Sequence, residues 1–168
     1  MNKTLFIVSW MSLVILFFAC KGQNATQTTT TQQEEQKHWV KEINSEEFLR
    51  KVLDISSYKQ GEKLKFKGDK PIIVDFYADW CAPCRRQTPI LEKIAQEYEG
   101  QIDVYKIDVD KSKDIARFFN VSSIPLLLFV PKGGEIFFYT GLTPMEDLQE
   151  AVGMILPNLE QDSLQNKI

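Results

Sequence analysis

Apolar residues follow two patterns from residue 43 onward, short continuous runs and stripes with helical spacing. The run at 72–77 is apolar apart from one acid, which is typical of a strand buried on both faces. Elsewhere, apolar residues recur three and four positions apart, which predicts helices with one buried face. The predicted strands are 72–77, 102–109, 126–130 and 136–139, and the predicted helices are 44–53, 83–98, 110–119 and 143–156.

Capping residues mark the predicted helix starts. Asn44 can accept a hydrogen bond from the first turn of its helix, while Glu47 can reach back to the Asn44 backbone. Thr143 and Glu146 predict the same capping box before the last helix, with a proline at the first helical position. Asp110 is expected to cap the short helix that follows the second predicted strand.

The order of these elements restricts the topology. It reads helix, strand, helix, strand, helix, strand, strand, helix, with a polar stretch at 56–70 that predicts a loop. A helix between the first strands requires a parallel crossover, whereas the short link at 131–134 requires an antiparallel hairpin. The sequence therefore predicts an α/β fold in which a mixed central sheet is flanked by helices on both sides.

The composition is that of a globular protein with one domain of about 100–150 residues and some additional segments. The chain has 168 residues, of which 43% are hydrophobic, and its formal net charge is −3. Because no basic excess is present, we expect no nucleic-acid partner. One histidine and three cysteines exclude most metal sites that need several such ligands.

The N-terminus has the pattern of an export signal. Lys3 is the only charge before the apolar run at 5–19, which is shorter than the roughly 20 residues that span a bilayer. Cys20 follows, and polar sequence begins at once. This resembles a bacterial lipoprotein signal, in which the cysteine becomes the first residue and carries lipid, although Phe17 stands where that pattern usually has leucine. The alternative is a signal anchor with an incidental cysteine.

The predicted organisation has four parts. Residues 1–19 are the signal peptide, and 20–37 are a Thr- and Gln-rich segment that we expect to be a disordered tether. Residues 38–157 are the folded domain, and 158–168 are a C-terminal tail. On this interpretation the domain lies on the periplasmic side, anchored to a membrane through lipid on Cys20.

A CxxC motif lies between the first buried strand and the following helix. Unpaired N–H groups and the helix dipole at that position stabilise the thiolate of Cys81. Its pKa should fall below the usual value of about 8.5, as in other CxxC motifs. We therefore expect Cys81 to be the exposed nucleophile and Cys84 the more buried thiol that resolves a mixed disulfide. Arg85 and Arg86 follow; they could add to the positive field at Cys81 or point to solvent, and solvent is favoured for one of them.

The CxxC motif has two other possible roles, a metal site and a structural disulfide. Structural zinc needs four ligands, and the remaining candidates are Cys20 and His38, so we expect no metal. A purely structural disulfide is typical of exported proteins, but closing so short a loop adds little stability. The redox interpretation is therefore favoured, and it requires no dissociable cofactor besides the Cys81–Cys84 disulfide itself.

Asp75 is the one acid within the apolar strand. Burial would raise its pKa toward neutrality, and it could then accept the proton of Cys84 during the exchange reaction. Alternatively, Asp75 faces water or pairs with Lys106 on the next strand. Lys106 could also do both, tuning the pKa of the acid while partly compensating its charge.

Together, these motifs resemble the thioredoxin family. The resemblance rests on 74–84, which reads Val-Asp-Phe-Tyr-Ala-Asp-Trp-Cys-Ala-Pro-Cys, on Pro89 within the helix, on Ile124-Pro125 before a strand and on Gly141 after the last strand. It covers about 71–156 and implies the thioredoxin fold. It also implies that Pro89 kinks its helix.

The resemblance implies a role for each matching residue. Cys81 would be the attacking thiol, Cys84 the resolving thiol and Asp75 a buried proton acceptor. Pro125 would be cis and face the CxxC motif, and the backbone of Ile124 would pair with a substrate segment. The implied substrate-binding residues are Trp80, Ala82, Pro83, Ile124, Pro125 and Gly141.

Two residues depart from the family pattern. Ala82 stands where thioredoxins usually carry glycine, and Tyr77 stands where many have tryptophan. The residues between the cysteines tune the reduction potential, which ranges from about −270 to about −120 mV in such proteins. Ala82 therefore leaves the direction of electron flow open.

The sequence predicts a membrane-tethered, monomeric thiol–disulfide oxidoreductase that reduces disulfides of other exported proteins. A membrane-embedded thiol protein is the expected electron donor. One alternative is an oxidase or isomerase of the same fold, and another is a non-catalytic thioredoxin-like binding module. A reductase dedicated to cytochrome maturation usually has a central insertion, and none is present between Cys84 and Pro125.

Overall fold

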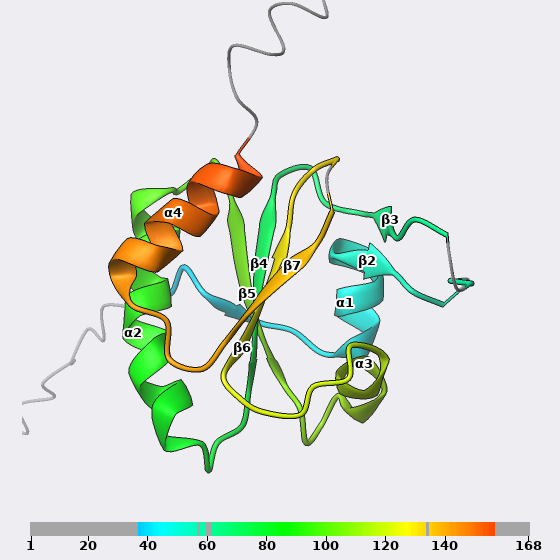
Figure 1. Cartoon of the computed structure of the whole chain (residues 1–168), viewed down its shortest axis with the longest axis horizontal. Helices are drawn as coiled ribbons and strands as arrows, with labels where there is room; N and C mark the ends of the chain where they lie inside the picture. Colours follow the sequence, from blue (N-terminus) through cyan, green and yellow to red (C-terminus); the bar gives the residue numbers. More distant parts are fainter. Residues whose placement is uncertain (1–36, 57, 60–61, 134, 157–168) are drawn as a thin grey trace, which may run out of the picture. The chain divides into compact units, whose positions relative to one another are not determined.

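The computed structural model describes residues 37–56, 58–59, 62–133 and 135–156 (Figure 1). The predicted signal peptide at 1–19, the lipidation site Cys20, nearly all of the predicted tether and the tail at 158–168 lie outside the described residues. The predictions for those segments therefore stay predictions.

Five strands form the central sheet, in the order β1-β5-β4-β6-β7. The first three are parallel to one another, β6 runs antiparallel to β4, and β7 runs antiparallel to β6. The mixed sheet predicted from the element order is thus confirmed. The strands are β1 (Lys41–Glu42), β4 (Ile72–Tyr77), β5 (Asp103–Asp108), β6 (Leu126–Val130) and β7 (Phe137–Thr140).

Four helices cover the two faces of the sheet. Figure 1 shows α2 and α4 on one side of the strands and α1 and α3 on the other. In the part of the chain that the structure describes, no helix is both long and apolar enough to cross a membrane. The helices are α1 (Ser45–Lys51), α2 (Ala82–Glu97), α3 (Lys113–Phe118) and α4 (Met145–Ile155).

The core consists of two main apolar clusters, one on each face of the sheet. All six residues of β4 are buried, and its aliphatic residues and Phe76 divide between the two clusters. Ile73 packs with α2 and α4, while Ile72, Val74 and Phe76 pack with α1 and α3. Burying each such side chain contributes about 1.5–3 kcal/mol. Asp75 has the same parity as Ile73, so it lies on the face that α2 covers.

Three short strands were not predicted. β1 adds to the edge of β5, while β2 (Leu53–Asp54) pairs with β3 (Lys65–Phe66) in a separate antiparallel sheet. β3 lies within the stretch 56–70 that was predicted to be loop throughout. A strand of two residues places one side chain on each face of the sheet. Its sequence therefore contains no repeated alternation of apolar and polar residues that could predict it.

The helix caps correct two sequence predictions. The capping box of Asn44 and Glu47 is confirmed. Asp110 was wrong as a cap, since α3 begins after Ser112. The box predicted for Thr143 was also wrong. The N-cap of α4 is Pro144, which has no polar side chain, so Thr143 lies one position too early to cap the helix; its hydroxyl donates to the carbonyl of Gly141 at 3.2 Å.

Candidate active site

The turn between β4 and α2 carries a disulfide between Cys81 and Cys84, with an S–S distance of 2.03 Å. Cys81 is the N-cap of α2, and its sulfur accepts a hydrogen bond from the Cys84 N–H at 3.2 Å. The sulfur therefore lies where the first amides of the helix are free to stabilise negative charge. When the disulfide is reduced, this position favours the thiolate of Cys81 over that of Cys84.

Both cysteines are buried, with 3% of Cys81 and 1% of Cys84 exposed. The prediction of an exposed Cys81 was therefore wrong for the disulfide form. Its sulfur lies 3.8 Å from the carbonyl oxygen of Ile124, and the disulfide packs with Tyr77 and Val109. Sequence position alone could not show this, because the covering residues come from distant parts of the chain.

The segment before β6 closes the site from a second side. The Ile124–Pro125 peptide bond is cis, as the resemblance implied. The N–H of Gly141, at the end of β7, donates to the carbonyl of Pro125 at 2.8 Å. Gly141 has φ of +88°, a conformation that side chains disfavour and glycine adopts readily. The structure thus brings Cys81, Ile124, Pro125 and Gly141 together from three separate segments.

The rim of the site is polar and aromatic. Trp80 is 67% exposed, and its indole N–H donates to Asp110 at 2.8 Å, so the ring is fixed although solvent reaches it. Ala82 is exposed and Pro83 is half-buried at the start of α2. Arg85 and Arg86 are both exposed. Exposed aromatic surface with a fixed orientation is suited to contact with another polypeptide.

Asp75 is 1% exposed, and its Oδ1 has no hydrogen-bond partner among the described residues. Burial raises the pKa of Asp75 from its ordinary 3.8 to about 7, while the nearby Lys106 ammonium opposes this rise. Desolvation therefore outweighs the attraction of the lysine. Near neutral pH, this carboxyl group can both accept and release a proton.

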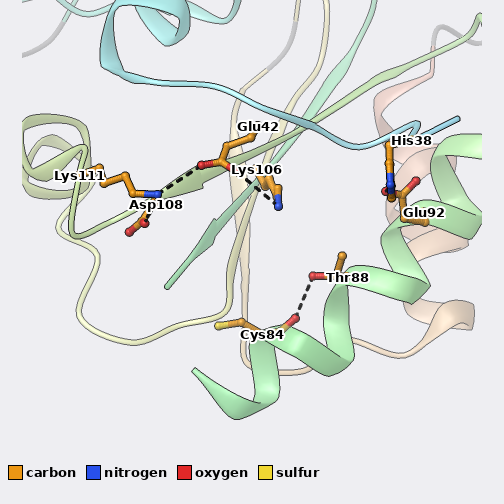
Figure 2. Close-up of polar contacts among 8 residues, drawn as sticks. All are labelled: His38, Glu42, Cys84, Thr88, Glu92, Lys106, Asp108 and Lys111. Atoms are coloured by element: carbon orange, nitrogen blue, oxygen red, sulfur yellow. Dashed lines mark hydrogen bonds and ion pairs between the residues drawn. The ribbon is translucent and has the colours of Figure 1, made fainter. Parts of the chain in front are cut away.

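Lys106 lies opposite Asp75 in the strand register, but its ammonium is engaged elsewhere. Its Nζ lies 3.6 Å from a carboxylate oxygen of Glu42 and 4.9 Å from the centre of the Tyr77 ring. Figure 2 shows the ion pair with Glu42 beside a second one, between Lys111 and Asp108 at 3.1 Å. Among the described residues no ion pair within 4 Å joins Lys106 to Asp75, so the direct pair is wrong for this structure, whereas the expected tuning is seen in the lowering effect of Lys106 on the pKa of Asp75.

Thr88 makes a further contact within α2, near the disulfide. Its hydroxyl donates to the carbonyl oxygen of Cys84 at 3.2 Å (Figure 2). Pro89, the next residue, lies inside the same helix, where it supplies no N–H for the helical ladder.

Gln87 is a buried polar residue that the sequence analysis missed. Its amide group accepts from the Thr143 N–H at 2.7 Å and donates to the Thr143 carbonyl at 3.2 Å. This pair of hydrogen bonds fixes α2 to the segment between Gly141 and α4. The available signal was its spacing, since Gln87 lies four and seven positions before Leu91 and Ile94 on the buried stripe of α2.

Within the described ranges, no group of three or more His, Cys, Asp or Glu side chains could hold a metal ion. The reactive groups of the site are the sulfurs of Cys81 and Cys84 and the buried carboxyl group of Asp75, and the backbone of Ile124 lies next to the disulfide. Two cysteines that bond to each other at a helix start, next to a cis-proline segment, define a thiol–disulfide oxidoreductase.

Comparison with known proteins gives the family. The thioredoxin family model matches residues 40–153, and the chain therefore belongs to the thioredoxin family. The chain is 45% identical over 93 residues to thioredoxin of Borreliella burgdorferi, covering 55% of this chain and 77% of that protein. It is 38% identical over 93 residues to thioredoxin-2 of Saccharomyces cerevisiae, covering 55% of this chain and 88% of the relative.

A solved structure of chloroplastic thioredoxin z is also similar. The TM-score is 0.55 at 30% identity, over 69% of this chain and 93% of that chain. The predicted thioredoxin fold and the assignment as a disulfide oxidoreductase are thus confirmed. The disulfide between Cys81 and Cys84 is the redox pair of this enzyme.

Proposed function

We propose that this enzyme reduces disulfides in exported proteins and works on a membrane, to which lipid on Cys20 anchors it. The reductase activity is carried by one observation, the Cys81–Cys84 disulfide at the start of α2. The exported location is supported by the signal-like run at 5–19 and the cysteine that follows it.

The reaction begins with the reduced enzyme. The Cys81 thiolate attacks one sulfur of a substrate disulfide, and the other substrate sulfur leaves as a thiolate. The Cys84 thiol then loses its proton, and its sulfur attacks Cys81 in the mixed disulfide. The second substrate thiolate leaves, and the enzyme disulfide forms. Two electrons have moved from the enzyme to the substrate, whose two thiolates take up protons.

Asp75 is the proposed acceptor of the Cys84 proton. Its carboxylate is available near neutral pH, because burial raises the pKa of Asp75 to about 7. Asp75 lies on the β4 face that α2 covers, and Cys84 is in the first turn of α2. A base whose pKa is close to the working pH combines availability with driving force for proton transfer.

The substrate would bind as an extended segment along the backbone of Ile124. In the part of the chain that the structure describes, the N–H of Ile124 donates no hydrogen bond, and its carbonyl oxygen lies 3.8 Å from the Cys81 sulfur. Trp80, Ala82, Pro83, Pro125 and Gly141 would contact the bound segment on either side of this edge. An extended substrate segment can form backbone hydrogen bonds with such an edge. Because these bonds do not depend on side chains, substrates of many different sequences could bind.

After each turnover the enzyme disulfide must be reduced again. Outside the cytoplasm we expect no soluble nicotinamide supply, so the proposed donor is a membrane-embedded thiol protein. The proposed tether at 20–37 would let the domain reach both this donor and its substrates.

The activity is tested by insulin reduction with the purified full chain and dithiothreitol as the electron source. The wild type should accelerate insulin precipitation, while Cys81→Ser should fall to the uncatalysed rate. Equal rates for the two proteins would exclude the proposed role of Cys81.

The anchor is tested by growing cells that express the chain with labelled palmitate and then separating membranes from soluble material. The wild type should carry label and sediment with membranes, whereas Cys20→Ala should carry none. A labelled Cys20→Ala protein would exclude lipid attachment at this cysteine.

A further inference from the structure

A row of three charged residues crosses the sheet beside the disulfide. Glu42 in β1 lies opposite Lys106 in β5, and Lys106 lies opposite Asp75 in β4. The lysine therefore stands between two acids, one at the edge of the sheet and one in its interior. Adjacent strands are about 4.8 Å apart, so the flexible stem of a lysine can carry its ammonium group to either neighbour.

In this structure Lys106 pairs with the outer acid. Its Nζ lies 3.6 Å from Glu42, and it sits over the ring of Tyr77 at 4.9 Å. Figure 2 shows the ion pair between Lys106 and Glu42. No ion pair within 4 Å joins Lys106 to Asp75 among the residues that the structure describes.

Among the residues that the structure describes, Lys106 is the one charged group that measurably shifts the pKa of Asp75. The buried side chains of α2 and α4 carry no charge, and their single ionisable member, Cys84, is in the disulfide. On the neighbouring strand β6, the residue opposite Asp75 is Leu127. The remaining charges nearby, Asp108 and Lys111, belong to the network that includes Glu42.

We propose that Glu42 is a positioning residue that draws the ammonium group of Lys106 away from Asp75, and thereby keeps Asp75 a competent proton acceptor. Lys106 already opposes the raised pKa of Asp75 without touching it, and a direct ion pair with its ammonium would lower that pKa further, by roughly 1–3 pH units. Paired in that way, Asp75 would be too weak a base for a thiol. The inference rests on the proposed role of Asp75, but it concerns a property of the resting protein.

The test measures the titration of Asp75 directly. Isotope-edited NMR of aspartate carboxyl carbons is recorded across pH on the oxidised full chain, with the Asp75 signal assigned by its loss in Asp75→Asn. The variants are Glu42→Gln, Lys106→Met and the double variant. Glu46→Gln is the matched control, because Glu46 is an exposed acid near Glu42 in sequence that makes no ion pair with Lys106.

In Glu42→Gln the freed ammonium should move toward Asp75, and the titration midpoint should fall by about one pH unit or more. Glu46→Gln should leave the midpoint within about a tenth of that change. In the Lys106→Met background, Glu42→Gln should have no further effect, because the group that Glu42 positions is gone.

Three results would overturn the proposal. An unchanged midpoint in Glu42→Gln would mean that Lys106 does not respond to Glu42. An equal fall in Glu46→Gln would indicate only a general loss of negative charge. A fall that persists in the double variant would mean that Glu42 acts on Asp75 without Lys106. Because no turnover is measured, a failure of the insulin assay would be a separate result.

Discussion

Asp75 should make the stability of the oxidised protein depend on pH in an unusual direction. In the unfolded chain its carboxyl group ionises with the ordinary pKa of 3.8, whereas in the folded protein burial raises that pKa to about 7. Between these values the folded state binds more protons than the unfolded state. The free energy of unfolding should therefore fall as the pH rises from about 4 to about 7, and stay lowered above that.

The size of the effect follows from the same values. The pKa of folded Asp75 lies about three pH units above the unfolded one, and each pH unit corresponds to about 1.4 kcal/mol. Ionised Asp75 therefore costs the folded state about 4 kcal/mol above neutrality and nothing below about pH 4. Asp75→Asn removes the titration while nearly keeping the shape of the protonated acid. It should raise the free energy of unfolding by that amount at about pH 8.

The assay is urea denaturation of the oxidised wild type and Asp75→Asn at about pH 4 and about pH 8. Asp108→Asn is a control with the opposite sign. Burial would raise the pKa of Asp108, but the Asp110 N–H and Lys111 outweigh burial and hold it below its ordinary value. Asp108→Asn should therefore lose stability at the higher pH. If Asp75→Asn and the wild type differed equally at both pH values, the account of Asp75 would be wrong.

Three further predictions concern other parts of the domain. Gln87→Leu leaves both backbone groups of Thr143 without partners, so urea denaturation should show a loss of about 1–3 kcal/mol; an unchanged midpoint would mean that this link is dispensable. Asn44→Ala removes the side chain that accepts a hydrogen bond from the Glu47 N–H at the start of α1. The free energy of unfolding should fall by about 0.5–2 kcal/mol in the same assay, and no fall would contradict the capping role of Asn44. In the reduced protein, iodoacetamide should modify Cys81 faster than free cysteine near neutral pH, as mass spectrometry of the peptide can measure; an equal rate would exclude a stabilised thiolate.

The parts of the fold that the sequence could predict are those with long, repeated signals. The run at 72–77 coincides with β4, and the helix predicted at 83–98 is α2 to within one residue at each end. The CxxC motif and Asp75 could be predicted because each differs from the sequence around it. The motif is a cysteine pair at a helix start, and Asp75 is an acid within an apolar strand. Such signals are local, so a single sequence contains them.

What the sequence could not predict depends on contacts between distant residues. The burial of Cys81 requires Ile124, which is 43 positions away. The ion pair between Lys106 and Glu42 depends on β1, which places Glu42 opposite Lys106. β1 has only two residues and forms by pairing with β5, which is about 60 positions away in the sequence. Thr143 has the spacing of a capping box, but its backbone is bound by Gln87, and this contact between α2 and the α4 segment overrode the local preference.

The Gly141–Pro125 hydrogen bond has a consequence for how such an enzyme changes over time. The sulfur chemistry resides in one short turn, whereas part of the surface proposed to contact a client protein comes from two later stretches of the chain. If those stretches do contact clients, substitutions in them would change which clients bind while the cysteine pair stays the same. Reactivity and selectivity would then be able to change separately.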